Sequence, residues 1–197
     1  DEVTSHSSIF DADYTYFSSY SDSWVAHAKR YAEARVERFG LDAGSQVVEV
    51  ASNDGYLLKN YAEQGITVLG IDPAEGPATA AEKVGVPTRV DFFGEQLGQQ
   101  LGNERRADVI HANNVLAHVA DTNGFVAGIA ALVAPTGVAV LEVPYVRDLV
   151  EHNEFDTIYH EHVSYYSCLS VQAMMARHGL TLCDVEEFPD MHGGTLR

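Results

Sequence analysis

The sequence predicts an α/β fold, with a doubly wound, seven-stranded mixed sheet whose last strand is antiparallel. Short apolar runs alternate with helical patterns along most of the chain, as in repeated strand–helix units that build a parallel sheet. Glycine or proline closes several of these segments. Of the 197 residues, 46% are hydrophobic and 21% are charged, which suits one domain with a sizeable core.

The expected elements follow one another in a regular order. An N-terminal aromatic and helical segment, residues 1–40, precedes a domain of residues 41–197 and ends at Gly40 as a helix C-cap. The domain's expected strands are the apolar runs 46–51, 66–72, 86–93, 107–114 and 137–145. The expected helices between them are 54–65, 76–85, 94–103 and 122–135, the last closed by Pro135. A helix at 170–180 and a final antiparallel pair, 181–188 with 191–197, complete the pattern.

Charge and cysteine content disfavour several kinds of partner. The net charge is −17, from 12 Lys and Arg against 29 Asp and Glu, so neither nucleic acid nor an anionic membrane is an expected partner. A small molecule is expected instead, and a phosphate-bearing one would need a local basic pocket. Cys168 and Cys183 lack metal-ligand spacing, which favours a reduced cytoplasmic setting. No apolar run or signal-peptide pattern indicates a membrane segment, and the abrupt end at HGGTLR suggests a piece of a longer polypeptide.

The first strand–helix turn, EVASNDG (49–55), has the small residues of a cofactor-binding turn. In open α/β sheets ligands bind at the carboxyl ends of the strands, beside this turn. The turn lacks the G-x-G-x-x-G pattern, which disfavours a dinucleotide. Asp72 ends the second strand and could accept hydrogen bonds from ribose hydroxyls, in a dinucleotide or an adenosyl-methionine site. An acid in this position is also a common turn former.

The remaining strand ends favour S-adenosylmethionine (SAM). Asp91 offers a carboxylate for an exocyclic amine, and the two phenylalanines after it offer a surface for a purine, with core packing as their alternative role. Two asparagines after the fourth strand suit the amino-acid end of the cofactor, with turn chemistry as the alternative. The expected cofactor residues are Ala51, Asn53, Asp54, Gly55, Asp72, Pro73, Asp91, Phe92, Phe93, Asn113 and Asn114.

Two further segments are rich in functional side chains. FDTIYHEHVSYYS (155–167) contains His160 and His162, which would share one face of an extended segment. Catalysis, metal binding and purely structural hydrogen bonding are all compatible with that spacing. The aromatic N-terminal segment could pack in the core or close over the cofactor. The expected substrate or lid residues are Tyr14, Tyr16, Tyr20 and His192.

Several motifs resemble those of the SAM-dependent C-methyltransferases that methylate deoxysugar nucleotides in antibiotic sugar pathways. The motifs are YFSSYSDSW, EVASNDG, GIDPAE, ANNVLAHVAD, FDTIYHEHVSYYS and HGGTLR. The resemblance covers nearly the whole chain and implies a class I methyltransferase fold, which is Rossmann-like. Full-length members add an upstream zinc-binding part and a downstream second α/β domain, so zinc is expected only outside this chain. Ala51 stands where the family generally has glycine, and we expect the turn to require a negative φ there.

The resemblance implies methylation of a carbon atom in a keto-deoxysugar nucleotide. A base removes the proton beside the ketone, and the resulting enolate attacks the methyl group of SAM. The resemblance implies His162 as the general base, Tyr159 and Glu161 as assisting groups, and His118 beside the methyl-transfer centre. Two alternatives remain open. The chain could be a small-molecule O-methyltransferase in which His162 deprotonates a hydroxyl, or a SAM-binding module that is incomplete without flanking domains.

Overall fold

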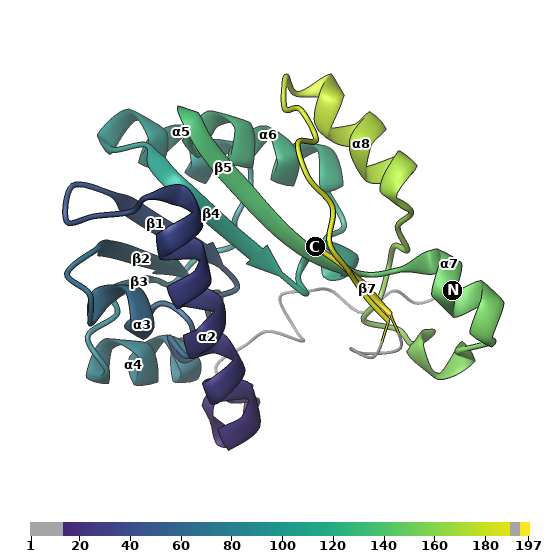
Figure 1. Cartoon of the computed structure of the whole chain (residues 1–197), viewed down its shortest axis with the longest axis horizontal. Coiled ribbons are helices and arrows are strands. Elements are labelled where there is room, and N and C mark those ends of the chain that lie inside the picture. The colour runs from purple at the N-terminus through teal and green to yellow at the C-terminus, as the bar shows by residue number, and fades with distance from the viewer. Residues whose placement is uncertain (1–13, 190–193) are drawn as a thin grey trace. The chain divides into compact units, whose positions relative to one another are not determined.

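The computed structural model describes residues 14–189 and 194–197. Its seven strands have the order β3-β2-β1-β4-β5-β7-β6, which confirms the predicted seven-stranded mixed sheet (Figure 1). β1 pairs in parallel with β2 and β2 with β3, whereas β7 pairs antiparallel with both β5 and β6. The strands are β1 (Gln46–Val50), β2 (Thr67–Ile71), β3 (Thr88–Arg89), β4 (Ala107–Asn113), β5 (Val133–Pro144), β6 (Glu187–Phe188) and β7 (Thr195–Leu196). The last strand of the chain is therefore antiparallel, as predicted.

The described chain divides into two compact units. The first contains the residues up to Phe93 together with Ala107–Ile110, and the second contains Gly94–Arg106 together with His111–Arg197. Among the described helices, none combines the length and the apolar character needed to cross a membrane.

The first unit surrounds β1, all five residues of which are buried. Its helices are η1 (Ser18–Tyr20), α2 (Asp22–Phe39), α3 (Lys59–Ala62) and α4 (Glu75–Lys83). Ser21 begins α2 by accepting a hydrogen bond from the Trp24 N–H at 3.3 Å. Gly40 ends α2 in a left-handed conformation with φ 61°, so the predicted C-cap is confirmed.

The predicted helix 54–65 is wrong in extent, because only Lys59–Ala62 form α3. The preceding residues form turns in which Asn53 and Gly55 have left-handed φ values of 49° and 76°. A Cβ on Gly55 would lie 3.0 Å from a Val86 methyl group, so this turn needs glycine for space as well as for conformation. The tight turn after β1 thus delays the helix by about one turn, since left-handed residues cannot join an α-helix.

The second unit is built on β5 and two helices that lie side by side (Figure 1). These helices, α5 (Glu95–Glu104) and α6 (Thr122–Leu132), approach so closely that a Cβ on Gly98 would lie 2.5 Å from the Cα of Gly128. Asp121 begins α6 by accepting a hydrogen bond from the Gly124 N–H at 2.9 Å. The glycines therefore set the packing distance of α5 and α6.

Several predicted boundaries of the second unit are wrong. Pro135 does not close α6, because β5 begins at Val133 and contains the proline near its start, where a missing N–H is tolerated. A helix that the sequence did not predict, α7 (Val146–His152), follows β5 directly. The unit also contains η2 (Leu116–His118), η3 (Phe155–Thr157) and α8 (Cys168–Arg177). The expected strands 86–93 of the first unit and 181–188 of the second shrink to two-residue strands, β3 and β6.

We predict that Gly98→Ala destabilises the protein by about 1–3 kcal/mol, because the added methyl group meets the backbone of Gly128 and the helices must separate. Gly94→Ala is the matched control, since no atom lies within 4 Å of a Cβ built there and its φ of −168° suits any residue. Denaturant unfolding of both variants measures the difference. Equal stability of the two variants would contradict the close helix contact.

Candidate active site

A buried carboxylate organises the turn after β1. The Asp72 side chain is only 5% exposed; its Oδ2 accepts a hydrogen bond from the Asn53 N–H at 2.8 Å and its Oδ1 accepts one from the Ala74 N–H at 2.9 Å. Burial raises the pKa of Asp72 above its ordinary value of 3.8, because desolvation outweighs the two hydrogen bonds that stabilise the charge. Each oxygen keeps a further lone pair that could accept a ligand hydroxyl.

The side chains of Asn53 and Asp54 hold the N-terminal segment. Asn53 Oδ1 accepts a hydrogen bond from the Ser18 N–H at 2.8 Å, and its Nδ2 donates to the Tyr16 carbonyl at 3.0 Å. Asp54 Oδ2 accepts from the Ser19 N–H at 3.0 Å. Three polar side-chain atoms of this turn therefore bind the chain itself, and the Asn53 N–H already donates to Asp72. The assignment of both residues to a cofactor stays a prediction.

Ala51 contradicts the expectation of a negative φ, because its φ is 57°. The left-handed conformation costs an alanine about 1–2 kcal/mol, through contact of its Cβ with the carbonyl oxygen. The turn keeps it nonetheless, and the next residue, Ser52, donates its backbone N–H to the Ile71 carbonyl of the neighbouring strand at 3.2 Å. The hydrogen bonds of this turn thus hold Ala51 in the left-handed backbone conformation that glycine would adopt at no such cost.

The other predicted cofactor residues of the first unit follow β2 and β3. Pro73 comes directly after Asp72 and is half-buried. The exposed Asp91 carboxylate forms an ion pair with Arg89 at 3.5 Å. Phe92 is 48% exposed, so the alternative of core packing is wrong for this residue. Phe93 is half-buried. An exposed phenylalanine could still offer its ring to a ligand.

In the second unit, the two asparagines at the end of β4 have different surroundings. Asn114 has a left-handed φ of 53°, which is a turn conformation that asparagine tolerates, so turn chemistry applies to it as considered. Its N–H donates to the Glu142 carbonyl at 2.9 Å and its Nδ2 donates to Glu142 Oε2 at 3.5 Å. The Oδ1 of Asn113 is buried and has no hydrogen-bond partner within residues 14–189 and 194–197.

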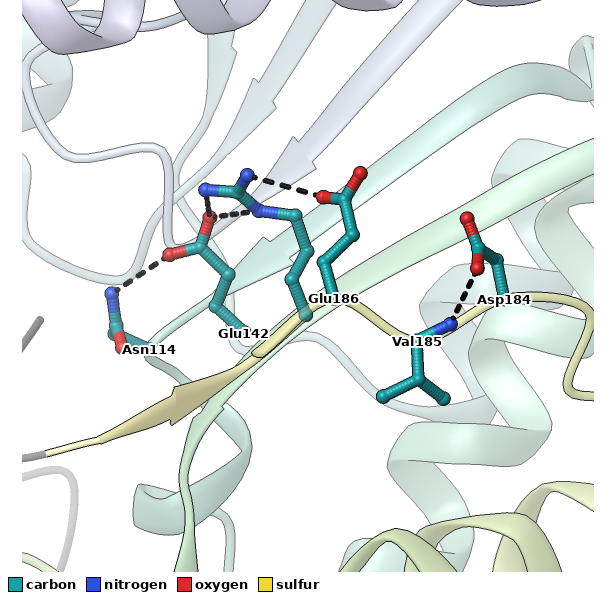
Figure 2. A network of polar contacts seen from close by, with 6 residues as sticks. Asn114, Glu142, Asp184, Val185 and Glu186 are labelled. Carbon is teal, nitrogen blue, oxygen red and sulfur yellow. Dashed lines mark hydrogen bonds and ion pairs between the residues drawn. The ribbon is translucent and has the colours of Figure 1, made fainter. Parts of the chain in front are cut away.

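Glu142 and Arg197 form a hydrogen-bond network with Asn114, although the sequence did not predict either of them as a site residue. Glu142 lies in β5 and is 2% exposed, and its Oε1 accepts from Arg197 Nε at 2.8 Å. Figure 2 shows the Glu142 carboxylate close to Asn114, with Glu186 farther along the same network. A charged residue inside an otherwise apolar strand requires a buried partner, and that requirement is the signal that could have identified Glu142.

The second unit also places His162 between two hydrogen-bond partners. His162 Nδ1 lies 3.1 Å from the Thr157 carbonyl oxygen, and Nε2 lies 2.9 Å from the Tyr159 hydroxyl. A carbonyl oxygen only accepts, so Nδ1 carries the proton and the neutral ring keeps its lone pair on Nε2. The Tyr159 hydroxyl then donates to Nε2. The geometry fixes one tautomer and points the basic nitrogen at a phenol.

His118 contacts this group from η2. Its Nδ1 lies 3.1 Å from the Glu161 carbonyl oxygen, and its ring centroid lies 4.8 Å from that of His162 in an edge contact. The N–H groups of Val163 and Ser164 donate to the Ala117 carbonyl at 2.9 and 3.2 Å. The backbone therefore joins η2 to the segment after His162 and brings together the two histidines that the sequence placed far apart.

Glu161 and His160 lie toward solvent. The His160 side chain is 74% exposed, and its Nε2 lies 3.9 Å from Glu161 Oε1. Partial burial raises the pKa of the Tyr159 phenol, and the Glu161 charge raises it further. Structural hydrogen bonding and catalysis both stay predictions for His160. Over the described ranges, no group of three His, Cys, Asp or Glu side chains could hold a metal ion.

The expected substrate or lid residues are only partly described. Tyr16 and Tyr20 are 60% and 80% exposed, so the core alternative is wrong for both, and the Tyr20 ring stacks on Phe17 at 5.3 Å. Tyr14 is half-buried. His192 lies outside the described residues. A lid formed by these tyrosines stays a prediction.

Comparison with known proteins finds a matching family and longer relatives. A family described as "Methyltransferase domain" matches residues 24–185. The chain is 36% identical over 184 residues to C-methyltransferase NovU from Streptomyces niveus, covering 93% of this chain and 44% of that protein. It is 27% identical over 100 residues to a ubiquinone biosynthesis O-methyltransferase from Rhodopseudomonas palustris, covering 50% of this chain and 40% of that protein. The chain thus spans less than half the length of these curated relatives.

Solved structures share the fold. A SAM-dependent methyltransferase from Archaeoglobus fulgidus has a TM-score of 0.65 at 16% identity, with 81% of this chain and 72% of that chain covered. Magnesium protoporphyrin IX methyltransferase from Synechocystis PCC 6803, solved with bound SAH, has a TM-score of 0.65 at 14% identity, with 87% and 80% covered. At such identities the likeness shows the fold alone, and the predicted class I methyltransferase fold is confirmed.

We predict that Ala51→Gly stabilises the protein by about 0.5–1 kcal/mol, because the cost of a left-handed alanine exceeds the extra unfolded-state freedom of glycine. Ala74→Gly is the matched control. Ala74 is also in the first unit but has a φ of −87°, so glycine should destabilise the protein there. Denaturant unfolding compares the two variants with the parent chain, and a loss of stability in Ala51→Gly would contradict the argument from strain.

Proposed function

The chain belongs to the methyltransferase domain family, and from this premise we propose that it is a SAM-dependent C-methyltransferase of a keto-deoxysugar nucleotide. The observation that carries the proposal is the His162 group, in which the imidazole lies between the Thr157 carbonyl and the Tyr159 hydroxyl and contacts a second histidine. The 36% identity to a C-methyltransferase, over an alignment that covers 93% of this chain, supports carbon as the acceptor atom.

The residues present fit SAM in their chemistry. The buried Asp72 carboxylate suits ribose hydroxyls, because each of its oxygens can accept one more hydrogen bond. The buried Asn113 Oδ1 suits a donor such as the ammonium group of the amino-acid end. When bound, SAM supplies an electrophilic methyl group on its sulfonium. The acidic chain, with a net charge of −17, also favours a cationic cofactor.

His162 acts as the base in the proposed reaction. Its Nε2 lone pair takes the proton from the carbon beside the ketone, while Nδ1–H continues to donate to the Thr157 carbonyl and stabilises the resulting cation. Before substrate binds, the Tyr159 hydroxyl donates a hydrogen bond to this lone pair. Displaced by the substrate, the phenol is free to donate to the ketone oxygen as negative charge develops there.

Two other functions remain candidates. The match to O-methyltransferases over half of the chain favours an alternative in which the same His162 deprotonates a hydroxyl. The incomplete coverage of longer relatives favours a module that binds SAM but needs further domains for the sugar nucleotide. The 12 Lys and Arg residues against 29 Asp and Glu agree with weak binding of a diphosphate by this chain.

We predict that Asp72→Ala weakens binding of S-adenosylhomocysteine (SAH) at neutral pH by about tenfold or more, through loss of a charge-assisted acceptor. Binding to the parent chain should also weaken on acidification. Ribose hydroxyls favour the ionised carboxylate, so affinity is full above the raised pKa of Asp72 and falls as pH drops through it. Titration calorimetry over a pH series measures both effects.

Asp22→Ala serves as the control for this experiment, because Asp22 is exposed, lies in α2 of the same unit and is not among the predicted cofactor residues. Its effect should be smaller than that of Asp72→Ala. Unchanged SAH affinity in Asp72→Ala would remove the ribose assignment. No SAH binding by the parent chain would count against the SAM proposal as a whole.

We predict that the enzyme exchanges the substrate C–H for deuterium in heavy water without a methyl donor, because deprotonation beside a ketone is reversible. His162→Asn should abolish exchange and methyl transfer together while keeping SAH binding. His160→Asn should spare both, because that side chain is 74% exposed. Proton NMR follows the exchange, using the chain or a longer natural form that contains it.

The result also separates carbon from oxygen methylation. An O-methyltransferase has no reason to exchange a carbon-bound proton. Full methyl transfer by His162→Asn would show that the base assignment is wrong.

A further inference from the structure

A buried ion pair lies beside the end of β4. The side chains of Glu142 and Arg197 are 3% and 6% exposed, and Arg197 Nη2 lies 2.6 Å from Glu142 Oε1. Arg197 Nε donates to the same oxygen at 2.8 Å. Both contacts use Oε1, so the other carboxylate oxygen, Oε2, remains for a different donor.

Further contacts fix the guanidinium. Arg197 Nη1 reaches Glu186 Oε2 at 3.4 Å. The guanidinium carbon lies 4.4 Å from the centroid of the Phe188 ring. The backbone groups of Arg197 and Glu186 also exchange hydrogen bonds of 2.9 and 2.8 Å. Arg197 is therefore held by an ion pair, an aromatic face and a strand ladder.

The free oxygen of Glu142 orients the Asn114 amide. A carboxylate only accepts hydrogen bonds, so the Asn114 amide must turn its Nδ2 toward Oε2, and the distance between them is 3.5 Å. Figure 2 shows the Asn114 oxygen pointing away from Glu142. The backbone hydrogen bond from Asn114 N–H to the Glu142 carbonyl, 2.9 Å long, fixes the same residue at a second point.

We propose that the Glu142–Arg197 pair is a positioning element that presents the Asn114 Oδ1 as an acceptor for the ammonium group of the methyl donor. This inference rests on the proposed SAM-dependent function. The neighbouring Asn113 Oδ1, buried and without a hydrogen-bond partner in the described chain, offers a second acceptor of the same kind. Two amide oxygens accept hydrogen bonds and do not donate them, so they select a cationic N–H group over a carboxylate or a phosphate.

Stability alone does not require this ion pair. Apolar residues of similar volume often replace a buried ion pair without loss of stability, whereas removal of one partner is costly. An apolar residue at position 142 would leave the Asn114 amide free to turn. The carboxylate, with Arg197 to neutralise it, is the arrangement that accepts from Nδ2 and excludes the opposite orientation.

Glu142→Gln tests the orientation directly. The glutamine oxygen must face the two Arg197 donors, so its NH₂ group faces Asn114 and reverses the Asn114 amide. Binding of SAH is compared with binding of 5′-methylthioadenosine, which keeps the nucleoside and the sulfur but lacks the amino-acid end. Glu142→Gln should weaken SAH binding by about tenfold or more and change methylthioadenosine binding less than about twofold. Each measurement is made on protein whose folding is checked by thermal unfolding.

Two further variants complete the experiment. Glu187→Gln is the matched control, because it makes the same change at the next residue, whose exposed carboxylate pairs with Arg147 at 3.0 Å and belongs to no contact of Glu142, Arg197 or Asn114 given above, and it should leave both affinities unchanged. Asn114→Ala should cause the same selective loss of SAH binding while keeping the ion pair. In the Asn114→Ala background, Glu142→Gln should have no further effect on the ratio of the two affinities.

The outcomes separate this inference from the proposed function. If the parent chain binds neither ligand, the SAM proposal fails and the positioning role fails with it. If the parent binds both and Glu142→Gln weakens them equally, the ion pair only maintains the fold and the inference is overturned. A further selective loss in the double variant also overturns it, since Glu142 would then act without Asn114. If Glu142→Gln does not fold, Asn114→Ala alone decides, and an equal loss of both ligands refutes the assignment.

Discussion

Two buried carboxylates hold the two left-handed turns at which β1 and β4 end. Asp72, at the end of β2, accepts from the backbone of Asn53 after β1. Glu142, in β5, accepts from the side chain of Asn114 after β4, and its carbonyl accepts from the Asn114 backbone. In each unit the acid belongs to the strand next to the turn in the sheet. The strand order therefore decides which acid can reach which turn, and the predicted ligand residues depend on those turns.

The two acids keep their charge in different ways. Asp72 relies on backbone N–H groups, which do not fully offset its burial, and its pKa is raised accordingly. Glu142 has a buried arginine that contacts one of its oxygens twice. The histidines of the second unit use a third arrangement, in which backbone carbonyls fix Nδ1 of His118 and of His162. In all these cases a backbone group or a neighbouring side chain fixes the donor and acceptor pattern before a ligand arrives, which lowers the cost of ordering it on binding.

The sequence predicted the parts of this arrangement that periodicity and strand ends reveal. The seven strands, the turn at EVASNDG, Asp72 and the YHEH segment were all recognisable. The pairing of His118 with the YHEH segment followed only from the resemblance, since 43 residues separate His118 from the carbonyl it contacts. Three features could not be predicted: the positive φ of Ala51, the hydrogen bonds that Asn53 and Asp54 form with residues 16–19, and helix α7. Contacts between segments far apart in the chain override local preference there. The sequence pattern does not point to Glu142, because this residue lies inside an apolar run, although a buried acid always needs a partner.

The negative charge of the chain affects the proposed methyl donor and the proposed sugar-nucleotide substrate in opposite ways. Among the described residues only five acids are buried, namely Glu49, Asp54, Asp72, Glu142 and Asp148. Of these, Glu142 pairs with Arg197, and Asp148 pairs with Arg147 at 2.8 Å. The net charge of −17 therefore remains largely with acids on the surface. A cationic sulfonium donor is attracted by such a field, whereas a diphosphate is repelled. The arginines of the second unit that pair with Asp148, Glu187, Glu142 and Glu186 are already neutralised by those acids. The charge of this chain is thus least suited to binding the nucleotide part of the proposed acceptor. The same charge favours binding of the cationic methyl donor.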